Sequence, residues 1–217
     1  MSSNAPNAVR LDIAPPGFSV AHYNRPGRRS GGIYVVHRAT FRCSALDFGI
    51  FTMFELLVTK LVCPESAIIL AVLYCPPGPA VDSFFEELET LIIYLHSSSS
   101  FFIICGNFNC PGSERLSSLL EENNLFQHVS FPTHWCGNTL DLIIISTSFS
   151  DSIKDVKSLN VTYSDHKIIL VDICTFSTPP LVETRTYEPI HCINLNRFQS
   201  DLMAVVNSLL SASLNLS

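Results

Sequence analysis

The order of apolar and polar positions along the chain predicts strands interrupted by two helices. Residues 67–74 and 101–105 are short, continuous apolar runs, which is typical of buried strands. Apolar residues recur at helical spacing from Phe84 to Leu95, and leucines do so within residues 114–123. Further strands are expected at 18–24, 32–38, 51–62, 126–130, 140–146, 154–160 and 167–174. This alternation predicts an α/β fold in which helices cover a sheet.

Serines mark the expected starts of the two helices. Ser83 and Glu86 have the spacing of a capping box, which predicts that the first helix begins there. Ser113 is expected to cap the second helix, because a serine hydroxyl accepts hydrogen bonds from the free amides of the first turn.

A change of composition predicts the domain organisation. Residues 1–175 are expected to form one α/β domain, and the Pro- and Thr-rich residues 176–193 to form a linker. Residues 194–217 have apolar positions at helical spacing and are expected to be helical. The chain has no apolar run of about 18 residues and no signal-peptide pattern. We therefore expect a protein without a membrane partner that is not secreted and stays intracellular, in the nucleus or cytoplasm.

Charge is distributed unevenly along the 217 residues. The chain has 13 Lys and Arg against 19 Asp and Glu, a net charge of −6. Residues 1–42 nevertheless hold six arginines and one acid, with Arg25, Arg28 and Arg29 close together. Such a basic arm on an acidic body can meet a polyanion locally. The alternative is that these arginines lie on an ordinary solvated loop.

Cysteine and histidine positions give little support for a disulfide framework or a zinc site. The eight cysteines are expected to be reduced thiols, because no secretion signal accompanies them. His128, His134 and Cys136 are candidate zinc ligands, but their spacing fits no common structural site. A glycine-rich phosphate loop and a GxSxG motif are also absent, which argues against nucleotide-triphosphate and serine-hydrolase chemistry.

Polar residues instead gather at the ends of the predicted strands, where α/β enzymes build their sites. Each one alone has a structural explanation as a turn former or strand cap. Their ordered combination makes them candidates for chemistry. They are Tyr74, Asn107, Asn109, Thr139, Asp141, Asp165 and His166.

In order and spacing, five segments resemble the endonuclease/exonuclease/phosphatase superfamily, and more narrowly the endonuclease domain of non-LTR (LINE-type) retrotransposons. The segments are PPGFSVAHYNRPGRRSGG (15–32), YCPPG (74–78), IICGNFN (103–109), NTLDLII (138–144) and SDHKIILVDI (164–173). The resemblance implies a two-sheet α/β sandwich that here lacks its N-terminal strands. It also implies that the segment from 176 onward leads to a reverse transcriptase, a partner region in an intact element.

The resemblance implies Mg²⁺-dependent hydrolysis of a DNA phosphodiester, the nicking of a target site. His166 would polarise the scissile phosphate, and Asp141 would orient its imidazole and favour the charged form. Asp165 and Asn107 would lie at the metal.

The remaining candidates would contact DNA or phosphate by the same resemblance. Tyr74 would stabilise a phosphate oxygen, and Asn109 would donate a hydrogen bond to the phosphate or the attacking water. Thr139 and the loop arginines Arg25, Arg28 and Arg29 would touch DNA, the arginines as forks matched to phosphate.

Departures from the family pattern predict impaired catalysis. Asn107 stands where the family's GDFN motif has aspartate, and its amide cannot take a proton at neutral pH. Cys75 stands where the family's YRPP motif has arginine. The family's metal-binding glutamate would precede Met1, so weak Mg²⁺ binding is expected. The sequence therefore favours a truncated pseudoenzyme. Two alternatives stay open: an active phosphodiesterase with a rearranged metal site that uses Glu55, and a non-catalytic nucleic-acid-binding remnant.

Overall fold

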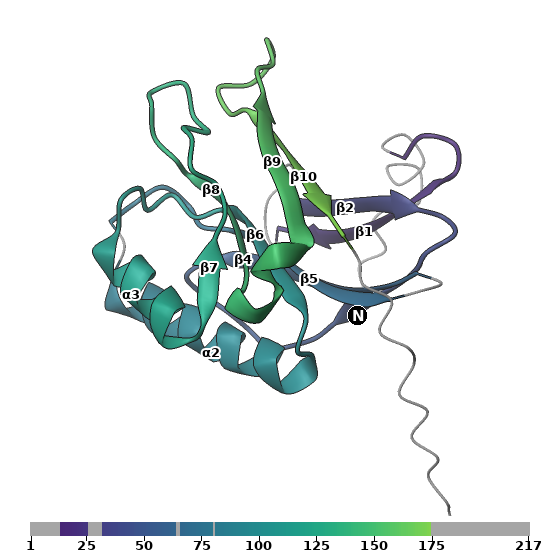
Figure 1. Ribbon diagram of the computed structural model, residues 1–217, viewed down its shortest axis with the longest axis horizontal. Coiled ribbons are helices and arrows are strands. Elements are labelled where there is room, and N and C mark those ends of the chain that lie inside the picture. The colour runs from purple at the N-terminus through teal and green to yellow at the C-terminus, as the bar shows by residue number, and fades with distance from the viewer. Residues whose placement is uncertain (1–13, 26–31, 64–65, 80, 175–217) are drawn as a thin grey trace, which may run out of the picture. The chain divides into compact units, whose positions relative to one another are not determined.

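The computed structural model describes residues 14–25, 32–63, 66–79 and 81–174, and it confirms the α/β class (Figure 1). One sheet has six strands in the order β3-β4-β5-β6-β8-β7, with β5 and β6 parallel and the other neighbours antiparallel. Its strands are Arg42–Leu46 (β3), Glu55–Val62 (β4), Ala67–Tyr74 (β5), Phe102–Asn107 (β6), Leu125–Gln127 (β7) and Asp141–Ser146 (β8).

Two antiparallel pairs of strands accompany the six-stranded sheet. Phe18–Asn24 (β1) pairs with Gly32–Arg38 (β2). Ile153–Leu159 (β9) pairs with Ile168–Ile173 (β10), and the 3-10 helix Thr147–Ser152 (η1) leads into them from β8.

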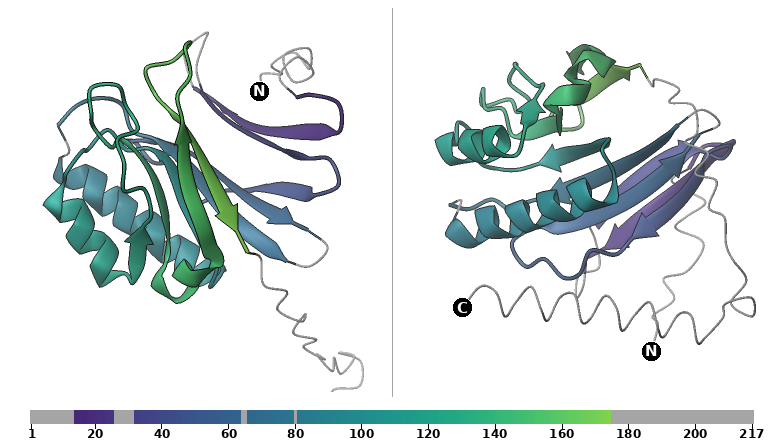
Figure 2. Two further views of the ribbon diagram at one scale, coloured as in Figure 1. Left: turned by 45° about the horizontal axis from the view of Figure 1, so that its top comes forward. Right: turned by 60° about the horizontal axis from the view of Figure 1, so that its bottom comes forward.

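The main core lies between the sheet and two helices, α2 (Asp82–Ser98) and α3 (Glu114–Glu122), which cover the same face in Figure 2. Alternate strand residues face this core, because side chains along a strand point to opposite sides. The buried strand residues include Val58, Ile69, Ala71, Leu73, Phe102, Ile104, Leu142 and Ile144. The helices contribute Phe84, Leu88, Leu91, Ile92, Leu95, Leu116, Leu119 and Leu120.

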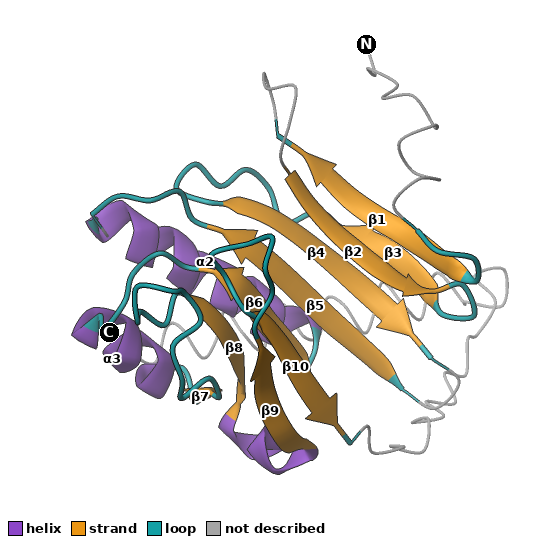
Figure 3. Cartoon of the chain, turned by 90° about the horizontal axis from the view of Figure 1, so that it is seen from above, coloured by secondary structure: helices purple, strands orange, loops and turns teal. Residues whose placement is uncertain are grey.

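The β1–β2 pair packs on the opposite face of the sheet, over β4 and β5 (Figure 3). Ile33 and Val35 of β2 bury themselves against Leu57 of β4. The partly buried residues around them include Leu70, Val72 and Tyr74 of β5. The strand residues of this second face are therefore the ones available to a site between the layers.

The two predicted helix caps have different outcomes. The first helix begins at Asp82, Val81 is its N-cap, and no side chain caps it. The capping box from Ser83 is therefore wrong, because Ser83 already lies inside the first turn. The cap at Ser113 is confirmed, since its hydroxyl accepts a hydrogen bond from the Leu116 amide at 3.2 Å.

Three strand predictions need correction. The edge strand β3 was not expected, because its residues are mostly exposed and lack a clear apolar pattern. The strand expected at 51–62 begins only at Glu55, because the amides of Thr52 and Met53 donate to the carboxylate of Glu87 on α2. The strand expected at 126–130 is the shorter β7.

The predicted linker and terminal helix, 176–193 and 194–217, lie outside the described residues and stay predictions. Within the described ranges, neither α-helix has the length and hydropathy needed to cross a bilayer.

Candidate active site

Four polar residues lie in one row across the sheet, on the face away from the helices. The strand register pairs Glu55 with Tyr74, Tyr74 with Asn107, and Asn107 with Asp141. Directly paired residues of neighbouring strands project to the same face, and the next residue along each strand points the other way. We call Glu55, Tyr74, Asn107 and Asp141 the polar row. It brings together three of the residues expected from the sequence.

Asn109 folds back against the row instead of projecting freely. The backbone amide of Asn109 donates to Asn107 Oδ1 at 3.0 Å, and the side-chain Nδ2 of Asn109 donates to the Cys75 carbonyl at 2.7 Å. Asn109 adopts φ 48°, a conformation that asparagine tolerates better than most residues. This side chain holds the end of β6 against the end of β5, and so helps to place Asn107.

His166 reaches the row through a hydrogen bond to Asp141. The distance from His166 Nδ1 to Asp141 Oδ2 is 2.7 Å, and both side chains are partly buried. Two backbone hydrogen bonds hold the His166 loop to the loop before β8: Trp135 N to Asp165 O at 3.0 Å, and Lys167 N to Thr133 O at 2.8 Å. Because Nδ1 donates to the carboxylate, Nε2 is the nitrogen that His166 can offer to a substrate.

His134 stands beside this pair and is a site residue that the sequence interpretation considered only for zinc. Its Nε2 lies 3.4 Å from Asp165 Oδ2, and its ring centroid lies 4.9 Å from that of His166. The Cys136 amide donates to Nδ1 at 3.3 Å, which leaves the proton on Nε2 to donate to Asp165. The pKa of Asp165 is lowered first by a hydrogen bond from the backbone amide of Asp165 itself, and second by the hydrogen bond from His134. This carboxylate is therefore ionised at neutral pH.

Arg25 closes the other end of the row. Its Nε donates to Glu55 Oε1, and its Cζ lies 5.3 Å from the centroid of the Tyr74 ring. Glu55 does not point to solvent, since only 16% of its side chain is exposed. Arg28 and Arg29 lie outside the described residues, so their DNA contacts stay predictions.

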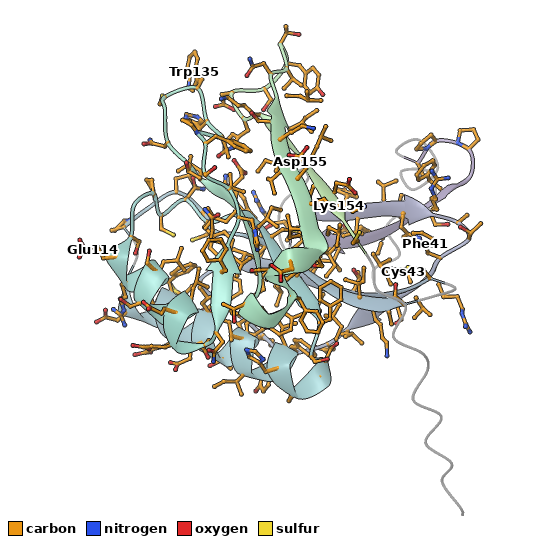
Figure 4. All side chains as sticks on the ribbon, in the orientation of Figure 1. Phe41, Cys43, Glu114, Trp135, Lys154 and Asp155 are labelled. Atoms are coloured by element: carbon orange, nitrogen blue, oxygen red, sulfur yellow. The ribbon has the colours of Figure 1, made fainter. Side chains whose placement is uncertain are left out.

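Thr139 lies in the loop before β8. Its hydroxyl donates to the Phe131 carbonyl at 2.9 Å, and the neighbouring Thr133 hydroxyl accepts from the amides of Leu140 and Asp141. The hydrogen bond from Thr139 to Phe131 shapes the loop that carries His134. The exposed Trp135 lies at the outer end of this loop (Figure 4). Its contact with DNA stays a prediction.

A comparison with protein families decides the membership of this chain. Residues 2–166 match the sequence model of the Endonuclease/Exonuclease/phosphatase family. The chain belongs to this family. No curated protein sequence matches it significantly.

Solved structures confirm the fold of this family member. The endonuclease domain of TRAS1, a telomere-specific non-LTR retrotransposon, is 15% identical with a TM-score of 0.59, over 72% of this chain and 78% of that one. The AP endonuclease LMAP from Leishmania major is 14% identical with a TM-score of 0.60, over 78% and 74%. The 3′ phosphatase NExo from Neisseria, bound to a product DNA hairpin, is 16% identical with a TM-score of 0.56, over 79% and 84%. At these identities the likeness concerns the fold.

Members of the Endonuclease/Exonuclease/phosphatase family are generally metal-dependent, and one cluster of this chain has ligand atoms close together. Ligand atoms of His134, Asp165 and His166 lie within 4.8 Å of one another. Mg²⁺ prefers oxygen ligands in octahedral geometry, whereas two of these three donors are imidazoles. Asp165 is also the single carboxylate of the cluster. This cluster therefore fits Mg²⁺ poorly, and the expected ligand pair of Asp165 and Asn107 stays a prediction.

The candidate zinc ligands do not assemble as a trio. Among the described residues, the cluster with metal-ligand spacing contains His134 but neither His128 nor Cys136. The His128 ring instead packs against Phe126, with 5.0 Å between centroids, and its Nε2 lies 3.3 Å from the Ser150 hydroxyl. His128 is thus part of the packing around β7 and η1.

The environment of His128 predicts a pH dependence of stability. Burial lowers the pKa of His128 below its ordinary value of 6.5, because the folded state disfavours the charged ring. The unfolded chain therefore binds more protons below pH 6.5, and the free energy of unfolding is expected to fall as the pH drops from 7.5 to 5. Urea denaturation across this range should show a shallower fall in His128→Gln than in the wild type. Parallel curves for the two proteins would contradict the assignment.

Proposed function

We propose that this chain carries a retrotransposon-endonuclease-type site that binds a DNA phosphodiester and hydrolyses it only slowly. The observation that carries the proposal is the His166–Asp141 pair at the end of a polar row that contains an amide, Asn107, where a proton-accepting group would be needed. Family membership supports the chemistry, and the segments 15–32, 74–78 and 138–144, which resemble non-LTR retrotransposon endonucleases, support the retrotransposon branch.

The row offers several hydrogen-bond donors to a phosphate. Asp141 accepts from His166 Nδ1, which fixes the orientation of the ring and directs Nε2 toward the substrate side. In the imidazolium form, Nε2–H donates to a phosphate oxygen, where negative charge grows in the transition state. The Tyr74 hydroxyl lies on the same face of the sheet and can donate to a second oxygen of the DNA phosphate backbone. These groups polarise and orient the substrate.

Asn107 limits the hydrolytic step. Water must lose a proton as it attacks phosphorus, and a carboxamide cannot accept one at neutral pH. Positioned acid–base catalysis contributes about 10²–10⁴-fold, equivalent to about 3–5 kcal/mol of barrier. The cluster of His134, Asp165 and His166 also fits Mg²⁺ poorly.

A plasmid-nicking assay in Mg²⁺ buffer, paired with a gel-shift assay, tests this function. We expect the wild type to bind DNA at low salt and to nick supercoiled plasmid slowly, and we expect His166→Ala to abolish the nicking. His37→Ala is the matched control, because His37 lies on β2, outside the polar row, and its Nδ1 hydrogen-bonds the neighbouring Arg38 carbonyl at 2.9 Å.

Two results would overturn the proposal. Nicking that persists in His166→Ala would show that the cleavage does not come from this site. Absence of DNA binding even at low salt would show that the site does not recognise a DNA phosphodiester.

A further inference from the structure

We propose that Glu55 is a positioning residue that holds Arg25 as a phosphate-binding cation at the far end of the polar row. The inference rests on the proposed function, since it concerns how the same site holds DNA. Neither the match to the family nor the likeness in fold assigns a role to this pair.

The contact between Arg25 and Glu55 leaves part of the Arg25 guanidinium available to bind a phosphate. Arg25 uses Nε to bind Glu55 Oε1, and its guanidinium also hydrogen-bonds Tyr74, whose ring centroid lies 5.3 Å from Cζ. A guanidinium carries five N–H donors in a rigid fork, and these two contacts use two of them. The remaining N–H donors can bind a phosphate.

Burial makes this a fixed arrangement rather than a loose surface ion pair. The side chains of Arg25 and Glu55 are 24% and 16% exposed, respectively. Glu55 Oε2 is buried and has no hydrogen-bond partner among the described residues. A buried carboxylate oxygen without a partner lowers stability, so the position of Glu55 is not explained by stability alone. Holding Arg25 in place gives this carboxylate a function.

The position of Arg25 in the row determines which phosphate it can bind. Arg25 lies at the β4–β5 end, beside Glu55 and Tyr74, whereas His166 lies at the β8 end beside Asp141. Three strand spacings separate Glu55 from Asp141, a span of about 14 Å at the usual 4.8 Å between strands. Arg25 therefore binds a phosphate flanking the one that His166 polarises. Loss of Arg25 should weaken DNA binding more than it slows the chemical step.

The sign of a charge change at Glu55 tests the inference. An acid that merely lies near DNA repels it, so Glu55→Gln would then strengthen binding. A carboxylate that positions Arg25 has the opposite effect, and we expect Glu55→Gln to weaken binding several-fold although it removes a negative charge. The measurement is fluorescence anisotropy of a labelled DNA duplex, titrated with the full chain at several salt concentrations.

A double-mutant cycle isolates the pair. Arg25→Met should weaken binding and reduce the slope of log K against log salt by about 0.9, the value for one phosphate contact on a duplex. In the Arg25→Met background, Glu55→Gln should no longer weaken binding, because nothing remains to be positioned. Glu89→Gln is the matched control: it makes the same charge change on the exposed surface of α2, on the helical face of the sheet, and should leave affinity unchanged.

A conservative variant keeps the test decisive if Glu55→Gln fails to fold. Arg25→Lys retains the charge but lacks the fork that binds Glu55 and a phosphate together. We expect weaker binding with an unchanged salt slope. Three results would each overturn the inference. They are tighter DNA binding by Glu55→Gln, an equal loss of affinity from Glu55→Gln with and without Arg25, and wild-type affinity in Arg25→Lys.

These binding data also separate the inference from the proposed function. If the chain binds DNA through Arg25 and Glu55 but never nicks it, the hydrolytic function fails and the positioning role stands. If the chain nicks DNA and Glu55→Gln does not raise KM, the positioning role fails and the function stands.

Discussion

Replacing Asn107 with aspartate is expected to raise the plasmid-nicking rate by about 10²–10⁴-fold, the usual contribution of one positioned acid–base group. Asn107 is the single amide of the polar row, between Tyr74 on β5 and Asp141 on β8. Aspartate has nearly the same shape, so the substitution supplies a proton acceptor without changing the packing of β6.

The local contacts of position 107 support this gain. The Asn109 amide donates to Asn107 Oδ1, and a carboxylate oxygen of aspartate can accept the same bond. Asp141 stands directly opposite, so its negative charge would raise the pKa of the new carboxyl toward neutral pH. A base whose pKa lies near the working pH is the most effective one.

Two variants control the Asn107→Asp experiment. Asn124→Asp adds the same charge at a turn residue with φ 54°, outside the polar row, and should not raise the nicking rate. The double variant Asn107→Asp/His166→Ala should lose the gain, because the new base still depends on a polarised phosphate. An Asn107→Asp protein that nicks no faster than the wild type would show that this amide does not limit hydrolysis.

Replacing Gly106 with alanine is expected to lower the free energy of unfolding by about 2–6 kcal/mol. Gly106 has φ +130°, and a Cβ built on it would lie 1.9 Å from the Leu73 carbonyl oxygen of β5. Strain of about 1–3 kcal/mol from the backbone conformation adds to about 1–3 kcal/mol from overpacking, because the obstacle is backbone that cannot rotate away. Since Gly106 precedes Asn107, the separation of β5 from β6 would also break the polar row.

Urea denaturation of Gly106→Ala and Gly112→Ala provides the comparison. Gly112 also has positive φ, at +65°, but a Cβ there meets nothing within 4 Å. Its substitution should therefore cost only the conformational strain, about 1–2 kcal/mol. Equal losses in the two variants would show that the close approach of Leu73 and Gly106 does not matter.

The sequence allowed the buried parts of the fold to be predicted. The runs at 67–74 and 101–105 became β5 and β6, and the helical spacing of leucines and phenylalanines became α2 and α3. These segments bury one or both faces, so their hydrophobic pattern is strong. The edge strand β3 and the late start of β4 were not predictable in this way. Their structure depends on pairing with β4 and on the carboxylate of Glu87, which is 34 or more residues away from the amides it binds.

The candidate site, like the fold, could be predicted from the sequence only in part. Motif order in the sequence identified Tyr74, Asn107, Asp141 and His166, because Tyr74 and Asn107 end strands and the other two stand at or just before the start of one. Only the tertiary structure paired Arg25 with Glu55 and joined His134 to Asp165. These contacts cross 30 or 31 residues and join loop side chains to partners that no local pattern specifies. The sequence by itself thus determined three of the four residues of the polar row, through the order of motifs at strand ends, and the strand register added Glu55. The fold decided what each of them binds, because hydrogen bonds and charges act over a few ångströms of space, irrespective of separation along the chain.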